Sequence, residues 1–121
     1  MKTSYQNIPA YITKDGSVVK ELMHPSVHGN IGISLAEAVV PARAITHLHR
    51  HRQSEELYHI VSGTGIMTLD TEQFVVETGD TVAIAPGILH QIQNHRNEPL
   101  KILCCCSPPY SHEDTELAGT V

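Results

Sequence analysis

Three histidines alternate with other residues in one short stretch of the chain, and this spacing is the first sign of chemistry. The stretch reads His47-Leu48-His49-Arg50-His51. In an extended strand, residues two positions apart project from the same face, about 7 Å apart along the backbone. Two of these imidazoles could therefore reach one metal ion from a single strand.

A carboxylate and another histidine follow where they could complete such a site. Glu55 and Glu56 come after a bend predicted at Gln53-Ser54, so the chain folds back and a carboxylate faces the imidazoles. His90 lies in a later segment, shortly after the turn-forming pair Pro86-Gly87. Three neutral imidazoles and one carboxylate leave a divalent ion about one net positive charge, and an octahedral ion keeps open positions. This arrangement is typical of a catalytic site, whereas a closed structural site fills every position.

Short segments with β propensity recur along the chain between turn signals, and these must position the histidines. The nine predicted strands span residues 17–23, 31–40, 45–51, 55–62, 65–69, 73–77, 80–85, 89–94 and 100–106. Helical periodicity is nowhere sustained, and Asp70-Thr71-Glu72 predicts a hairpin turn. Because open sheet edges are a liability, so many strands in a small domain favour a closed barrel or a two-sheet jelly roll.

The overall composition restricts the possible partners. The chain has 121 residues, a formal net charge of −5 and a hydrophobic fraction of 40%. These values predict one compact domain, and the negative charge argues against nucleic acid and anionic membranes. No apolar run approaches the roughly 20 residues that span a bilayer, and residues 1–10 contain no hydrophobic signal segment. We therefore expect a cytoplasmic protein with no nucleic-acid and no membrane partner.

The three cysteines are consecutive, at Cys104, Cys105 and Cys106. Neighbouring side chains in a strand point to opposite faces, so a disulfide between them is geometrically unfavourable. A thiolate metal cluster is the alternative, but it needs a second group of ligands that this end of the chain does not offer. We interpret the cysteines as buried free thiols that pack as small hydrophobic residues.

The spacing of the histidines and Glu56 resembles the first of two motifs of the cupin superfamily, in its small single-domain form. That motif runs Gly, five residues, His-x-His, three or four residues, Glu, six residues and Gly. Here His49-Arg50-His51 is followed after four residues by Glu56 and after six more by Gly63. Arg43 stands where the motif begins with Gly, a departure that concerns a turn and not the metal chemistry.

A later stretch resembles the second cupin motif, which runs Gly, five residues, Pro-x-Gly, two residues, His, three residues and Asn. Here Gly79 is followed after five residues by Ala85-Pro86-Gly87, then by His90 and Asn94 at the family's spacing. Ala85 stands in place of the motif's Pro, with Pro86 one position later. This departure affects a bend and leaves the ligand position filled.

The resemblance implies both a fold and a metal site. The fold is an all-β cupin-type double-stranded β-helix, a jelly-roll barrel, with residues 1–121 as a single domain. Residues 107–121 would form a C-terminal extension, and we expect its polar part to lie over the surface. The implied cofactor is one divalent metal ion, Mn, Fe, Ni, Co or Zn. Carried over residue by residue, the implied ligands are His49, His51, Glu56 and His90.

Strand alternation suggests further candidates for catalysis, namely Tyr58, His47 and Glu37. Tyr58 shares a face with Glu56, so we expect it in the pocket. His47 lies further out on the histidine face, and it is either a pocket residue or proton shuttle or a polar residue at the rim. Glu37 shares a face with the bulkier residues of segment 31–40; if that face points inward, Glu37 is a candidate general base, and otherwise a surface carboxylate.

Two classes of function agree with these patterns. The first is a metal-dependent enzyme that acts on a small oxygenated metabolite by isomerase, dioxygenase or decarboxylase chemistry. The second is a non-catalytic barrel that binds a metal or a small ligand such as a sugar. The cupin resemblance permits both, because a shared fold does not choose among chemistries. Small cupins commonly pair through their sheets, so we also expect a homodimer besides a small-molecule ligand or substrate.

Overall fold

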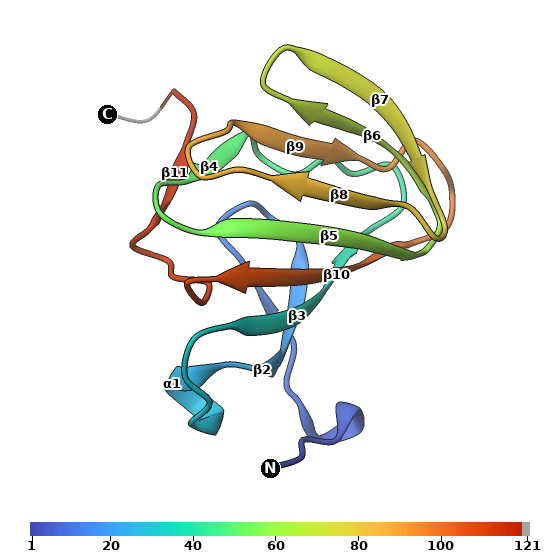
Figure 1. The fold of residues 1–121 in the computed structure, drawn as a ribbon. Coiled ribbons are helices and arrows are strands. Elements are labelled where there is room, and N and C mark those ends of the chain that lie inside the picture. Colours follow the sequence, from blue (N-terminus) through green and yellow to red (C-terminus); the bar gives the residue numbers. More distant parts are fainter. Residues whose placement is uncertain (120–121) are drawn as a thin grey trace.

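The chain folds into two antiparallel β-sheets packed face to face, as a computed structural model of residues 1–119 shows (Figure 1). The larger sheet has the order β1 (Tyr11–Ile12), β2 (Val18–Met23), β3 (Ser34–Val40), β10 (Leu100–Ser107), β5 (Glu55–Ser62) and β8 (Thr81–Ile84). The smaller sheet has the order β11 (Thr115–Leu117), β4 (His49–His51), β9 (His90–Gln93), β6 (Thr64–Leu69) and β7 (Glu72–Glu77). This arrangement confirms the predicted all-β jelly roll.

Within residues 1–119, helical structure is confined to two short elements in the N-terminal part of the chain. They are a 3-10 turn at Tyr5–Asn7 and the helix α1 at Pro25–His28, which ends at Gly29 in the left-handed conformation. Among the described residues, neither helix has the length or the apolar character needed to cross a bilayer.

The core lies between the two sheets and follows from the alternation of side chains along the strands. In β5, Glu56, Tyr58 and Ile60 are buried while their neighbours are exposed, and β10 buries every second residue. The largest fully buried apolar side chains include Ile60, Met67, Ile92, Leu100 and Ile102. The same alternation that packs these apolar residues also aims the polar side chains of β4 and β5 into the interior.

The β6–β7 hairpin lies where the sequence predicts it. Leu69 pairs with Glu72, so Asp70 and Thr71 form the turn. Asp70 has a φ of 53°, a left-handed conformation that Asp tolerates better than most residues. By contrast, the strand predicted at 45–51 is shortened to His49–His51, and residue 45 makes only a single bridge to Gln93.

The C-terminal segment differs from the expectation that it lies over the surface. Its strand β11 pairs with β4, and both Asp114 and Thr115 are buried. The Asp114 carboxylate accepts hydrogen bonds from the backbone N–H groups of Gln53 and Ser54, in the bend between β4 and β5. The buried polar residues of this segment thus satisfy polar groups beside the histidines, whereas His112 and Glu113 are exposed as expected.

The inward face of β3 is also opposite to the one that side-chain bulk suggests. Ser34, Ala36 and Ala38 face the interior, whereas Leu35 is 38% exposed. Glu37 lies on the outer face and accepts a hydrogen bond of 2.7 Å from the hydroxyl of Tyr5. The expectation that the bulkier face of a strand points inward fails here, because the interior next to β3 is a cavity. Small residues leave this cavity open.

Arg43 explains why a glycine suits the start of the first motif, because its φ is 64°. Its side chain donates hydrogen bonds to Asn97 Oδ1 (2.8 Å) and to the carbonyl oxygen of His95 (2.7 Å). Arg43→Ala and Arg43→Gly both remove these bonds, but only glycine relieves the left-handed strain of roughly 1–2 kcal/mol. We therefore expect Arg43→Gly to be more stable than Arg43→Ala by about 1 kcal/mol in urea denaturation. Equal free energies of unfolding for the two variants would contradict this.

Candidate metal centre

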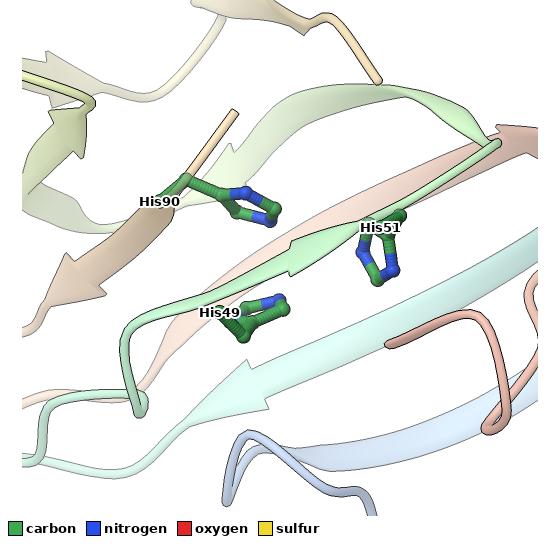
Figure 2. A group of neighbouring side chains, drawn as sticks. All are labelled: His49, His51 and His90. Carbon is green, nitrogen blue, oxygen red and sulfur yellow. The ribbon is translucent and has the colours of Figure 1, made fainter. Parts of the chain in front are cut away.

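Two neighbouring strands of the smaller sheet bring three histidines together. His49 and His51 project from the same face of β4, and His49 pairs in register with His90 of β9. Figure 2 shows the three rings turned toward one another. Their ligand atoms all lie within 4.8 Å of one another, and all three side chains are buried. This is the spacing at which three imidazoles can share one ion.

Glu56 reaches the same place from β5 of the facing sheet. Its Oε1 lies 3.0 Å from His51 Nε2 and 3.6 Å from His90 Nε2, and the carboxylate is buried. The structure therefore gathers all four residues that the sequence nominates as ligands. The shared donor set of imidazole and carboxylate suits a divalent transition metal.

Backbone carbonyls orient two of the rings. His49 Nδ1 lies 2.7 Å from the carbonyl oxygen of His47, and His90 Nδ1 lies 2.9 Å from that of Ile88. A carbonyl can only accept, so in both rings Nδ1 carries the hydrogen and Nε2 keeps its lone pair. His51 Nδ1 lies 2.9 Å from Thr115 Oγ1, whose own hydrogen goes to the carbonyl oxygen of Ser111, so Nδ1 is the donor. His51 Nε2 faces Glu56 Oε1 at 3.0 Å, and this is the nitrogen that would bind a metal.

His90 Nε2 provides the test of whether a metal fits. The side chain of His90 is fully buried, and its Nε2 has no hydrogen-bond partner among the described residues. A buried lone pair without a donor is destabilising and rare in native proteins. A cation bound between the three Nε2 atoms and Glu56 would satisfy it, so the donor set fits a metal.

Burial and neighbouring charges set the protonation of the site. Burial, together with the nearby His90, lowers the pKa of His49 from its ordinary value of 6.5 to about 4, although Asp15 opposes the shift. Burial alone would raise the pKa of Glu56, but hydrogen bonding from His51 and the proximity of His90 outweigh it and lower the pKa to about 2. At neutral pH, His49 is thus neutral and Glu56 is ionised, which are the forms that bind metals.

A cavity opens beside the histidines between the two sheets. The centres of water molecules can occupy about 40 Å³ of it, which is room for a small ligand only. Tyr58 lines the cavity as expected, and burial raises its pKa well above the ordinary value. The wall of the cavity on the larger sheet includes small residues, namely Ser34, Ala36, Ala38, Cys104 and Cys106.

The cysteines are free thiols, and two of them face this cavity. Cys104 and Cys106 are buried on the inner face of β10, whereas Cys105 is partly exposed on the outer face. Cys106 is more than a small hydrophobic residue, because its Sγ donates a hydrogen bond of 3.2 Å to Glu56 Oε2. This contact fixes the second carboxylate oxygen while Oε1 faces the histidines.

The other two catalytic candidates lie outside the cavity. The ring of His47 is exposed, and only its backbone carbonyl takes part in the site, by holding His49. Its amide donates a hydrogen bond of 2.8 Å to the carbonyl oxygen of Asp15. Glu37 lies on the outer face of β3, as described above, so it does not reach the cavity.

Sequence reasoning missed several polar residues of the cavity. Asp15 Oδ2 lies 3.7 Å from His49 Nε2, and Glu21, Tyr110 and Thr115 also line the wall. Glu21 shares the inner face of β2 with Val19, so strand alternation could have found it. Asp15 precedes Gly16 in a loop, where the pair indicates only a turn.

Comparison with known proteins agrees with this fold and site. The sequence pattern of the family described as "Cupin domain" matches residues 36–106. The chain belongs to the cupin family. A relative of this cupin, the uncharacterized protein MJ1618 of Methanocaldococcus jannaschii, is 56% identical over 117 residues, which are 97% of this chain and 94% of that protein.

Two solved structures show the same architecture as this cupin. The polyketide cyclase RemF of Streptomyces resistomycificus superposes with a TM-score of 0.83 at 15% identity, over 100% of this chain and 87% of that one. The oxalate decarboxylase of Lactobacillus farciminis, in a formate complex, superposes with a TM-score of 0.81 at 22% identity over 93% of this chain. This cupin spans 34% of the length of that decarboxylase chain. At these identities the likeness establishes the fold alone.

Proposed function

We propose that this cupin binds one divalent metal ion and is an enzyme that acts on a small oxygenated metabolite. The ligands would be His49, His51, Glu56 and His90. The observation that carries the proposal is the buried Nε2 of His90, which has no partner in the described structure and lies beside two further imidazoles and a carboxylate. Four protein ligands leave room for a substrate oxygen on an octahedral ion.

The bound ion would supply a Lewis acid that stabilises negative charge on substrate oxygens, which suits isomerisation, decarboxylation or oxygen chemistry. The chain itself supplies the surroundings. Tyr58 stays protonated because burial raises its pKa well above the ordinary value, so it can donate a hydrogen bond to a substrate oxygen. The small residues of β3 and β10 shape a narrow, largely apolar space that limits the size of the substrate.

The first test is elemental analysis of natively purified protein, which names the metal, followed by assays of the metal-loaded protein. Oxygen uptake would select dioxygenase chemistry, release of CO₂ a decarboxylase, and interconversion of aldose and ketose an isomerase. Tight binding of a metabolite with no turnover would replace the enzyme by a non-catalytic binding barrel. Natively purified protein without any divalent metal would contradict the proposal.

Cys106 should strengthen metal binding through its hydrogen bond to Glu56. Loss of an outer-shell partner typically weakens metal affinity by roughly 10–100-fold. We expect Cys106→Ala to lower the affinity by about tenfold, and Cys106→Ser to restore most of it because a hydroxyl can also donate. Cys105→Ala is the matched control, since Cys105 faces the other side of β10. Equal metal affinities of Cys106→Ala and Cys105→Ala would contradict this role.

The outer face of the larger sheet supports a homodimer, which we propose as the state in solution. Cys105 pairs in register with both Leu35 and Leu57, and the two leucines are 38% and 42% exposed. This apolar row lies on adjacent strands, and a second copy could cover it. Light scattering should report about twice the chain mass of 13.3 kDa, and Leu57→Glu should shift the protein toward monomer. A monomer for the unchanged protein would contradict the proposal.

A further inference from the structure

We propose that the cavity takes a small ligand without negative charge, which directs an O–H or N–H donor at Glu21 while its other end faces the histidines. This inference rests on the proposed function, because it assigns the histidine end of the cavity to the metal, and it adds the class of ligand. The inference depends mainly on Glu21, which lines the cavity. Its Oε2 atom is buried and has no hydrogen-bond partner among the described residues.

Only one oxygen of Glu21 is satisfied within the protein. Glu21 Oε1 accepts a hydrogen bond of 2.8 Å from the hydroxyl of Tyr11, which fixes the carboxylate in place. A carboxylate oxygen that is removed from water without a donor is costly, and a hydrogen bond to a charged group is among the strongest in proteins. A ligand donor in the cavity would remove this cost, so Oε2 is suited to recognise one.

The sheet order separates Glu21 from the metal ligands. Glu21 lies on β2, and two strands, β3 and β10, stand between β2 and the strand of Glu56. Three strand spacings amount to roughly 14 Å between the backbones of β2 and β5. The inner face of β3 and β10, which lies between β2 and β5, carries small side chains such as Ala36 and Cys104, and these leave the cavity open. A ligand that lies along these two strands can therefore present one group to Glu21 and another to the histidines.

The cavity contains no cationic side chain that would receive an anion. Among the described residues that line it, none is Lys or Arg. Lys14 and Lys20 are the sequence neighbours of the wall residues, but both are engaged elsewhere. Lys14 Nζ donates to the carbonyl oxygen of Thr115 (2.7 Å), and Lys20 Nζ lies 3.9 Å from the ring centroid of Tyr5. An anionic group in the cavity would have only the metal to pair with.

The formal charges of the wall reinforce this preference. A divalent ion with three neutral imidazoles and Glu56 carries about one net positive charge. Asp15 and Glu21 add two carboxylates that line the same cavity, so the whole pocket has about one net negative charge even with the metal bound. Asp15 Oδ1 accepts hydrogen bonds from Thr13 and Ser17, and its Oδ2 lies 3.7 Å from His49 Nε2, so Asp15 belongs to the histidine end of the cavity. Glu21 Oε2 is the buried carboxylate oxygen at the other end.

The test uses three probes that share a 1,2-diol and differ only at the third carbon. Glycerol carries a hydroxyl there, 3-aminopropane-1,2-diol an ammonium group, and glycerate a carboxylate. The methyl groups of Ala36 and Ala38 line the cavity and report binding in NMR titrations of the natively purified protein. The variant is Glu21→Gln, and its matched control is Glu37→Gln on the outer face of β3.

We expect glycerol or the amine to bind more tightly than glycerate in the unchanged protein, and Glu21→Gln to weaken the better probe by about tenfold. Glu37→Gln should leave all three affinities unchanged. A preference for the amine identifies a cationic ligand, and a preference for glycerol a neutral one. If Glu21→Gln does not fold, Tyr11→Phe, which removes the donor to Oε1, should weaken the same probe severalfold.

Three outcomes would overturn the inference: tightest binding of glycerate, an unchanged affinity in the Glu21 variant, or no methyl shift with any probe. The metal content of the same samples separates this inference from the proposed function. Unchanged metal together with one of these outcomes refutes the ligand class and leaves the metal site standing. Protein that contains no divalent metal contradicts the proposed function, whatever the probes show.

Discussion

Replacing His51 by alanine should remove most of the divalent metal from the purified protein. His51 is a direct neighbour of Glu56 and of both other histidines, so its loss removes one of four proposed ligands. The affinity should fall by more than the roughly 10–100-fold that the loss of an outer-shell partner costs. Glu56→Ala should have an effect of the same order. Elemental analysis against protein concentration measures both.

The controls for this prediction are outward-facing neighbours of the same residue types. His59 lies on the exposed face of β5, where its Nδ1 contacts Thr81 Oγ1 at 2.8 Å, and Glu55 is the exposed residue before Glu56. His59→Ala and Glu55→Ala should keep the full metal content. Circular dichroism should show the β-sheet fold in all four variants. Full metal content in a variant lacking His49, His51 and His90 together would refute the assignment of the ligands.

The ligand residues could be predicted because their spacing is local. His49 and His51 are two positions apart in one strand, so the strand period places them on one face. Glu56 follows a short bend, which brings its strand back opposite the two histidines. His90 is distant in sequence, so its residue type made it a candidate ligand, but no local spacing placed it beside the others, and the family resemblance assigned it to the same ion. Its pairing with His49 across β4 and β9 supplies the physical reason for that connection.

The residues that surround the ligands could not be predicted in the same way. Cys106 approaches Glu56 because β10 inserts between β3 and β5, a pairing that no local pattern encodes. Thr115 reaches His51 because a polar C-terminal segment adds a strand beside β4. Long-range strand order decides both contacts, whereas periodicity informs only about the two faces of each strand.

Glu37 shows the opposite failure, in which a local rule was applied where the tertiary structure overrides it. Bulky residues usually face a core, and Leu35 and Val39 share its face. In β3 the interior needs space for a ligand, so the small residues turn inward and Glu37 turns out. Functional cavities are the places where this rule is expected to fail.

Acidification should destabilise the metal-free protein, with a sign that follows from two pKa shifts. The folded state lowers the pKa of His49 from 6.5 to about 4. Between these values the unfolded chain binds a proton that the folded chain does not, so stability is lost as the pH falls from 6.5 toward 4. The pKa of Glu56 falls from 4.5 to about 2, which adds a second loss as the pH decreases through that lower range.

Bound metal should raise the free energy of unfolding at neutral pH, and this gain should disappear in acid. At a free metal concentration of 100 times Kd the gain is about 2.7 kcal/mol, or roughly 10 °C in Tm for a domain of this size. A proton and the metal compete for the same Nε2 lone pair, and folded His49 takes the proton near pH 4, so the gain shrinks as the pH falls through that value. Melting curves of chelated and metal-loaded protein from pH 8 to pH 3 should converge at the acidic end, and metal-free His49→Gln should lose the decline between pH 6.5 and 4. Curves that stay separated by a constant interval down to pH 3 would show that the stabilising metal is bound without His49.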